Sequence, residues 1–239
     1  MSSKKKQAEL REEKDWEKID SAVHGSEHFI EKYQKQLLIG IGVIVVVVCG
    51  YLAYQQFIVG PKNKEAQVAL FKGEQYFRNG QDSLAIFGDP KAGYVGFESI
   101  IDEYGSTKAG KLAKLYAGIS YANLGQYEKA LDYLKGYSGS DKIISQLVNG
   151  TIGDCLDNTG KADEAVSYYE KAAKAVDNPS QSPILYKKAG LIYRNQGKYD
   201  KVIDVFTIIK NQYANSLQAG EAERYIEEAN VLKSGVQAK

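Results

Sequence analysis

Side chains suited to acid–base or metal chemistry are scarce in this 239-residue chain. His24 and His28 are four residues apart, a spacing that places two imidazoles on one face of a helix, where they could share a metal ion. No third ligand lies near them in the sequence, so the pair does not predict a metal site. The chain has no histidine after residue 28, and its larger part therefore lacks the most common general base.

The remaining candidates for chemistry are adjacent acidic residues and two cysteines. Asp102 and Glu103 are neighbours in a predicted helix, where consecutive side chains do not face each other. Cys49 lies inside a long apolar run and Cys155 lies far from it, so a disulfide between them is not expected. The sequence contains no Walker-type phosphate loop and no CxxC or HExxH motif. It predicts a non-catalytic protein without cofactor or metal.

The overall composition indicates a helical protein. Lysine and arginine total 31 against 30 acidic residues, and no basic stripe is concentrated in the folded part, so nucleic acid is not an expected partner. Only four prolines occur, and Ala, Leu, Glu, Lys and Tyr are frequent, which favours helices over a sandwich or barrel.

Residues 37–59 predict a transmembrane helix. No charge occurs from Leu37 to Tyr54, and about 20 apolar residues span a hydrocarbon core of roughly 30 Å. A buried core element is the alternative, but such elements are seldom apolar for so long. A cleaved signal peptide is disfavoured because the run starts far from Met1 and lacks a small-x-small cleavage site.

The flanks of this segment predict an orientation. The short tail, residues 1–36, opens with Lys4, Lys5 and Lys6, but the far flank is basic too. Long domains are translocated largely regardless of charge, so we expect the tail to stay cytoplasmic. Residues 60–239 would then lie on the other side of the membrane.

Glycines mark an internal repeat in the C-terminal part. Gly118 and Gly153 are 153 − 118 = 35 residues apart, and Gly153 and Gly190 are 190 − 153 = 37 apart. In each case a second glycine follows seven residues later (Gly125, Gly160, Gly197), and a large apolar residue follows nine after that (Leu134, Tyr169, Phe206). The first glycine permits close approach of two helices, the second suits a left-handed turn, and the large residue fills the groove. Such pairs must stack into a solenoid to bury their apolar faces.

Two further segments extend the repeat. Gly73 and Gly80 match a preceding first helix, and Phe97 stands where Phe206 stands in the last repeat. We expect residues 81–93 to form a lengthened turn, and we favour surface variation over a functional insertion there. At the other end, one face of a predicted terminal capping helix carries Ala222, Tyr225, Ile226 and Ala229.

The spacing of these residues resembles the tetratricopeptide repeat. The resemblance rests on Gly118, Tyr121, Gly125, Tyr127, Ala130 and Leu134, and on Gly190, Tyr193, Gly197, Tyr199 and Phe206. Together with the predicted transmembrane helix, it implies an all-α fold: a single transmembrane helix, then an α-solenoid of about four degenerate helix pairs and a C-terminal capping helix.

The repeat spacing also predicts a protein-binding groove along the stacked first helices. Its expected residues are Leu115, Ile119, Asn123, Asp154, Asn158, Lys187, Leu191 and Asn195. The three asparagines occupy one repeat position, where they could bond a peptide backbone or serve the helix-ending turn. A clamp for acidic C-termini, as in repeat domains that bind heat-shock chaperones, is disfavoured because only Lys187 is basic at the corresponding positions.

The order of tail, membrane span and repeats resembles the ancillary Sec translocon subunit family of the YfgM type. That resemblance implies a bacterial inner-membrane protein with a cytoplasmic N-terminus and periplasmic repeats. It also implies help in handling exported proteins, with translocon subunits, exported chains and chaperones as partners. The alternatives are a scaffold for envelope assembly or cell division, and an adaptor whose repeats face the cytosol.

Overall fold

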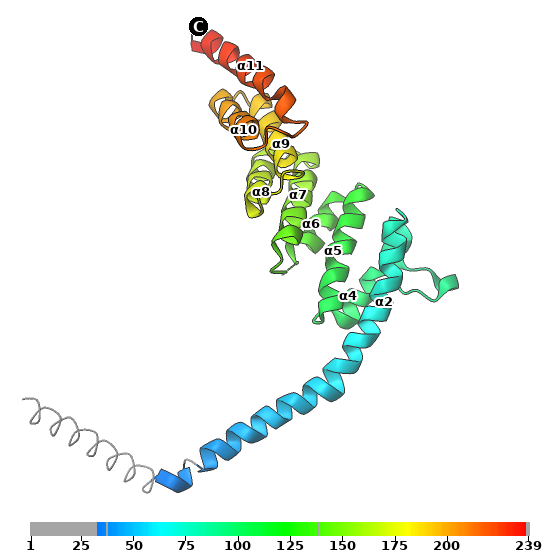
Figure 1. Ribbon diagram of the computed structural model, residues 1–239. Coiled ribbons are helices and arrows are strands. Elements are labelled where there is room, and N and C mark those ends of the chain that lie inside the picture. Colours follow the sequence, from blue (N-terminus) through cyan, green and yellow to red (C-terminus); the bar gives the residue numbers. More distant parts are fainter. Residues whose placement is uncertain (1–32, 37, 138, 238–239) are drawn as a thin grey trace, which may run out of the picture. The chain divides into compact units, whose positions relative to one another are not determined.

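The computed structural model describes residues 33–36, 38–137 and 139–237 (Figure 1). Expectations for the rest of the N-terminal tail, His24 and His28 included, fall outside these residues. The chain divides into two compact units, Met1–Pro61 and Lys62–Lys239.

The first unit is helical over residues 33–36 and 38–54, and a π-helical turn follows at Gln55–Val59. In the described part of the chain, Tyr33–Arg78 is the one helix long and apolar enough to cross a membrane, and none of its apolar window is buried. Val46, for example, is 71% exposed. A core helix would be covered by the protein, so this exposure is unlike that of a core element.

The second unit is a helical solenoid in which consecutive helices pack on each other, as Figure 1 shows from α4 to α11. Its helices are α2 (Gly60–Arg78), α3 (Asp82–Phe87), α4 (Phe97–Tyr104), α5 (Lys108–Asn123), α6 (Tyr127–Lys135), α7 (Lys142–Asn158), α8 (Ala162–Ala175), α9 (Ser182–Asn195), α10 (Tyr199–Gln212) and α11 (Ala219–Gln237). The described residues contain no strand, only an isolated bridge between Asp89 and Tyr94. The predicted all-α repeat fold is confirmed.

The repeat glycines have the roles that their spacing predicted. A Cβ atom at Gly118 would lie 2.6 Å from Leu134, and one at Gly153 or Gly190 would lie 2.7 Å from the ring of its partner on the second helix, Tyr169 or Phe206. Only a residue without a side chain allows this approach between the two helices of a pair. The second glycines have left-handed φ angles of 74°, 77° and 69°, at Gly125, Gly160 and Gly197 respectively.

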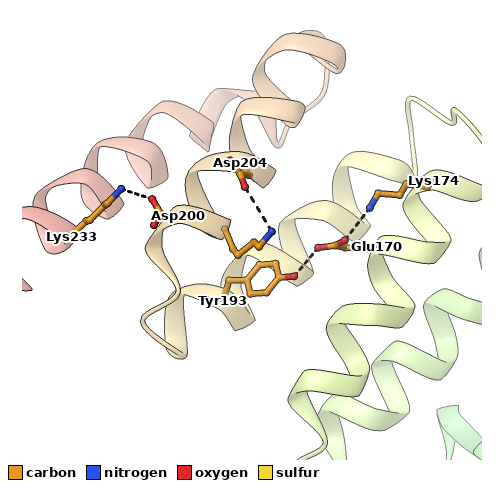
Figure 2. Close-up of polar contacts among 7 residues, drawn as sticks. Glu170, Lys174, Tyr193, Asp200, Asp204 and Lys233 are labelled. Atoms are coloured by element: carbon orange, nitrogen blue, oxygen red, sulfur yellow. Dashed lines mark hydrogen bonds and ion pairs between the residues drawn. The ribbon is translucent and has the colours of Figure 1, made fainter.

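Tyrosine–carboxylate hydrogen bonds join successive pairs. The Tyr193 hydroxyl on α9 donates to Glu170 on α8 at 2.8 Å, and Lys174 also contacts that carboxylate at 3.0 Å (Figure 2). The Tyr121 hydroxyl on α5 donates equivalently to Glu98 on α4 at 2.5 Å. Both tyrosines stand three residues after a repeat glycine. At the intervening junction that position holds Leu156, which is buried.

The structure corrects the prediction of a lengthened turn over residues 81–93. Residues Asp82–Phe87 already form α3, the start of the second helix, and Ala85 is fully buried. The chain leaves the helix at Gly88 and resumes it as α4 at Phe97. The insertion therefore interrupts the second helix and does not lengthen the turn between the two helices.

The inserted loop, residues 88–96, is held by its own contacts. Backbone N–H and C=O groups of Asp89 and Tyr94 bond each other at 2.8 and 2.9 Å. Tyr94 is buried, donates its hydroxyl to the Ala85 carbonyl at 2.8 Å and stacks on Tyr76, whose hydroxyl donates to Asp89 at 2.8 Å. Through Tyr76 and Ala85, these hydrogen bonds attach the loop to α2 and α3.

Helix α11 closes the solenoid as its amphipathic pattern predicted. Ala222 and Ala229 are buried, and Tyr225 stacks on Phe206 of α10 with ring centroids 4.4 Å apart. Lys233, one helical turn after Ala229, pairs with Asp200 of α10 at 2.5 Å and adds a polar contact between the two helices (Figure 2).

Candidate protein-binding groove

A hollow of about 310 Å³ lies between the first helices of two successive repeats, α7 and α9. Ile143, Leu147, Thr151 and Asp154 line it from one face of α7, since residues three and four apart share a helix face. Its full lining is Ile143, Gln146, Leu147, Gly150, Thr151, Asp154, Asn178, Gln181, Ile184, Leu185 and Lys188. A groove between first helices is where the repeat spacing predicted a binding surface.

The apolar side of the hollow has unpaired aliphatic side chains. Ile143 is 65% and Leu147 50% exposed, although both belong to a helix whose other face is buried. At the floor, Gly150 lets α9 approach closely, because a Cβ atom there would lie 3.1 Å from Leu185. Burying two large aliphatic side chains under a partner releases about 1.5–3 kcal/mol each.

A carboxylate and an ammonium group form the polar end of the hollow. Oδ1 of Asp154 accepts hydrogen bonds from the Tyr169 hydroxyl at 2.7 Å and from Lys188 Nζ at 2.5 Å. Burial and then the bond to Asp154 raise the pKa of Tyr169, so its hydroxyl stays protonated and donates. Both donors use the same oxygen, and Oδ2 makes no hydrogen bond to any described residue. Oδ2 is therefore available to accept an N–H from a bound segment.

Amide side chains form hydrogen bonds at the part of the hollow beside the α8–α9 turn. Gln146, 3% exposed, donates through Nε2 to the Ala172 carbonyl at 3.2 Å and to Ser182 Oγ at 3.2 Å. Asn178 Oδ1 accepts from the N–H groups of Ser180 at 3.0 Å and Gln181 at 3.2 Å. These bonds order the α8–α9 turn, so the rim needs little rearrangement to bind a partner.

The structure places the eight predicted groove residues in different settings. Asp154 lines the hollow. Leu115 is 4% exposed within the core, and Ile119 and Leu191 are half-buried. Lys187 points to the C-terminal helix, where it pairs with Glu221 at 2.6 Å, and its neighbour Lys188 is the lysine that lines the hollow.

The three equivalent asparagines, all exposed, do not share a role. Asn123 donates to both oxygens of Asp82 in the preceding repeat, each at 3.3 Å. Asn158 donates to the carbonyl of Asp154 in its own helix at 2.8 Å, which is turn chemistry. Asn195 is exposed at the end of α9.

Sequence reasoning missed Ile143, Leu147 and Lys188. The missed signal was the pair of aliphatic residues four apart at the start of α7, on the face away from the repeat glycines. The groove residues were predicted by counting from positions near those glycines, which lie one or two turns further along the helix.

The described residues hold no group of three His, Cys, Asp or Glu side chains that could bind a metal ion. Burial raises the pKa of Cys155 to about 11, so the thiol stays protonated at neutral pH and is a poor nucleophile. The chemistry available in the groove is hydrogen bonding, ion pairing and apolar contact.

Comparison with family models agrees with this architecture. Models described as tetratricopeptide repeat match residues 112–137, 148–175 and 185–216. No curated protein matches the chain. Among solved structures, a Podosopora anserina protein titled as a kinesin light chain with nearly identical TPR-like repeats is similar, with 14% identity and a TM-score of 0.45. That match covers 74% of this chain and 98% of the other.

The three segments that the family models match coincide with the pairs α5–α6, α7–α8 and α9–α10. The hollow lies between the last two of them. Over these three pairs the helical solenoid is similar to the tetratricopeptide repeat.

Proposed function

We propose that this protein is a membrane-anchored, non-catalytic module that binds segments of other proteins in the groove between α7 and α9. The observation that carries the proposal is the hollow lined by exposed Ile143 and Leu147 and ended by the Asp154 carboxylate. Exposed aliphatic side chains beside fixed polar groups suit a partner with an apolar side chain and free backbone N–H groups.

The anchor in this proposal is the apolar segment, residues 37–59, with the tail 1–36 on one side and the repeat domain 60–239 on the other. Its support is the length and exposure of the apolar helix. In lipid a helix satisfies all its backbone hydrogen bonds internally, so a run of β-branched valines is compatible with it. The uncharged stretch is long enough to cross a bilayer.

The biological setting we propose is the bacterial inner membrane, with a cytoplasmic N-terminus and periplasmic repeats. There the groove assists the handling of exported proteins at the Sec translocon, together with periplasmic chaperones. The support is the order of segments and the short lysine-led tail. A scaffold for envelope assembly or cell division is the second candidate, since it needs the same anchor and groove.

A photocrosslinking experiment in intact cells tests the groove. A photoreactive amino acid replaces Leu147, and a matched control carries it at Val231, which is 69% exposed on α11. We expect translocon subunits and exported chains to be recovered from position 147 and not from position 231. Recovery of only wall-synthesis or division proteins would favour the scaffold, and equal recovery from both positions would contradict a role for this groove.

Two substitutions sharpen this experiment. Ile143→Glu with Leu147→Glu places charge on the apolar side, and the high exposure of both residues should leave the fold intact. We expect capture from a probe at the nearby Thr151 to fall by about a hundredfold or more, because two aliphatic contacts of about 1.5–3 kcal/mol each are lost. Unchanged capture would mean that partners bind elsewhere.

Labelling tests the orientation. Leu217 is 90% exposed in the α10–α11 connection, so Leu217→Cys offers a reactive thiol. A membrane-impermeant maleimide applied to intact spheroplasts should label it, and the parent chain, which has Cys49 in the apolar segment and a buried Cys155, is the control. Labelling that occurs only after cell lysis would place the repeats in the cytosol.

A further inference from the structure

The inserted loop gives the first repeat a surface that the other repeats lack. Beside the loop, α2 and residues 93–95 enclose a shallow hollow of about 410 Å³. We call this surface the loop face. It is lined by Lys64, Glu65, Val68, Ala69, Lys72, Gly93, Tyr94 and Val95.

The loop face is apolar and open. Val68 is 65% exposed and Val95 54%, and Phe71, on the same side of α2 as Val68, is 59% exposed. The buried side of α2 is different, since Ala66, Leu70 and Gly73 pack into the domain. Three large apolar side chains gathered on one open surface mark an interaction site.

Lysines surround this apolar area. Lys64 and Lys72 stand one helical turn before and after Val68, and exposed Lys91 lies at the loop. None of the three forms an ion pair with a described residue, and within the described chain the Lys72 ammonium makes a single 3.5 Å bond, to the Gly93 carbonyl. Glu65 is the single acidic residue in the lining. Apolar side chains bordered by lysines have the chemistry that anionic lipid headgroups attract.

Few residues of chain separate the loop face from the apolar segment. Helix α2 begins at Gly60, the residue after that segment, and Val68 is eight residues further on. Eight helical residues rise about 12 Å, and even a fully extended chain of that length reaches only about 30 Å. This short tether favours the lipid surface over a soluble protein as the occupant.

We infer that the loop face rests on anionic lipid headgroups and holds the first repeat against the membrane surface. The inference rests on the membrane anchor proposed above. Lysine side chains contact lipid phosphates, while Val68, Phe71 and Val95 enter the region between headgroups and acyl chains. The docked repeat fixes the direction in which the solenoid leaves the membrane.

Tryptophan quenching in vesicles tests this inference on the full chain. Trp16→Phe removes the one native tryptophan, and Val95→Trp places a new one on the loop face. The control carries Leu217→Trp instead, on an exposed site in the α10–α11 connection. Both chains are reconstituted into vesicles of phosphatidylcholine and phosphatidylglycerol, with or without lipids brominated near the headgroup. Flotation of the vesicles reports insertion of the anchor, and circular dichroism reports folding.

We expect brominated lipids to quench the tryptophan introduced at position 95 and to leave the one at position 217 unchanged. Lys64→Gln with Lys72→Gln should lower the ratio of docked to undocked protein by about 30-fold, from the contribution of two lysines near an anionic surface. Pure phosphatidylcholine vesicles should lower it similarly.

Three results would overturn the inference. Floating vesicles in which the tryptophan at position 95 stays unquenched would leave the anchor standing and refute lipid docking. Crosslinking of position 95 to a protein in cells, without quenching in vesicles, would assign the face to a protein partner. A folded chain that fails to float would refute the anchor and the docking together, while capture from position 147 would still report on the groove.

Discussion

The first repeat and the α9–α10 repeat make the same contact between a glycine and an aromatic ring. They differ in the length of chain between the two residues. In the α9–α10 pair Gly190 meets Phe206, a sequence separation of 206 − 190 = 16. In the first repeat Gly73 meets Phe97, a separation of 97 − 73 = 24, and a Cβ atom on Gly73 would clash with the ring. The difference, 24 − 16 = 8, is the number of extra residues that the inserted loop adds between the glycine and the ring.

The two repeats share the packing contact between a glycine and an aromatic ring, although the number of residues between them differs. The contact, and not the sequence separation, therefore defines the structural repeat. Helix α3 supplies the start of the second helix and α4 supplies its end, and both pack on α5. An insertion is tolerated because both halves keep their partners. The loop then adds Tyr94 to the same contact, since a Cβ atom at Gly73 would also lie against its hydroxyl.

The largest effect should come from changing the length of the loop. Deleting residues 88–95 restores the spacing of the α9–α10 pair, so Phe97 still reaches Gly73 and the first repeat should fold, although less stably without Tyr94. Deleting only residues 88–94 rotates Phe97 by about 100° around the helix and should abolish the packing of α4. Hydrogen exchange of α4 and α5 in detergent-solubilised protein measures both outcomes. Equal protection of α4 from hydrogen exchange in the two deletions would contradict the claim that the contact between Gly73 and Phe97 defines the first repeat.

Removing the ring that meets the glycine should cost similar free energy in both repeats. Phe97 and Phe206 are fully buried, so Phe97→Ala and Phe206→Ala should each lower the free energy of unfolding by about 3–5 kcal/mol. Phe87→Ala is the control, because Phe87 is half-exposed. Urea titration, with hydrogen exchange measured for each helix, shows which helices lose stability in each variant. A cost below about 1 kcal/mol at Phe97 would show that α4 is not the end of the second helix.

Adding one methyl group to the glycines should have a smaller effect. Gly73→Ala and Gly153→Ala each force a neighbouring ring to move, at about 1–3 kcal/mol, partly offset by the better helix propensity of alanine. Gly220→Ala is the matched control, because no atom lies within 4 Å of its Cβ position. The control should be neutral or slightly stabilising by the same urea titration. A destabilised control would point to a general effect of the substitution.

The smallest effect should come from the hydrogen bond that joins two repeats. Tyr193→Phe removes the donor to Glu170 and should cost about 1 kcal/mol, because Lys174 still contacts that carboxylate. Tyr168→Phe is the control, since the Tyr168 hydroxyl makes no hydrogen bond to a described residue. Equal costs would show that the bond does not stabilise the junction.

The pH dependence of stability checks the same bond from both sides. Burial raises the pKa of Glu170, but the bonds from Tyr193 and Lys174 lower it, and the net shift is downward. The contribution of Glu170 to stability is therefore present above its unfolded pKa of about 4.3 and is lost as pH falls. Burial and the bond to Glu170 raise the pKa of Tyr193, so that contribution is present below about pH 10 and lost at higher pH. Tyr193→Phe should flatten both limbs of the stability profile.

The fold was predictable from sequence where one residue type has a single physical reason. Gly125, Gly160 and Gly197 were expected in left-handed turns and are found there, because a side chain is strained at that φ. The alanines of the terminal helix were expected on its buried face, and Ala222 and Ala229 are buried. The insertion was placed wrongly because residues 82–87 are too short a segment to show helical periodicity by themselves.

The groove shows the limit of the sequence more clearly. The repeat spacing predicted Lys187 for the groove and not the adjacent Lys188, but Lys187 pairs with Glu221 of α11 and Lys188 with Asp154 of α7. Each partner lies 34 residues away in sequence, on a different neighbouring helix. The sequence by itself determined the repeat, its longer helices and the apolar segment, because these depend on local spacing. Only the tertiary structure decided which side chains meet across repeats, because the rotation of each helix is set by packing against neighbours distant in the chain.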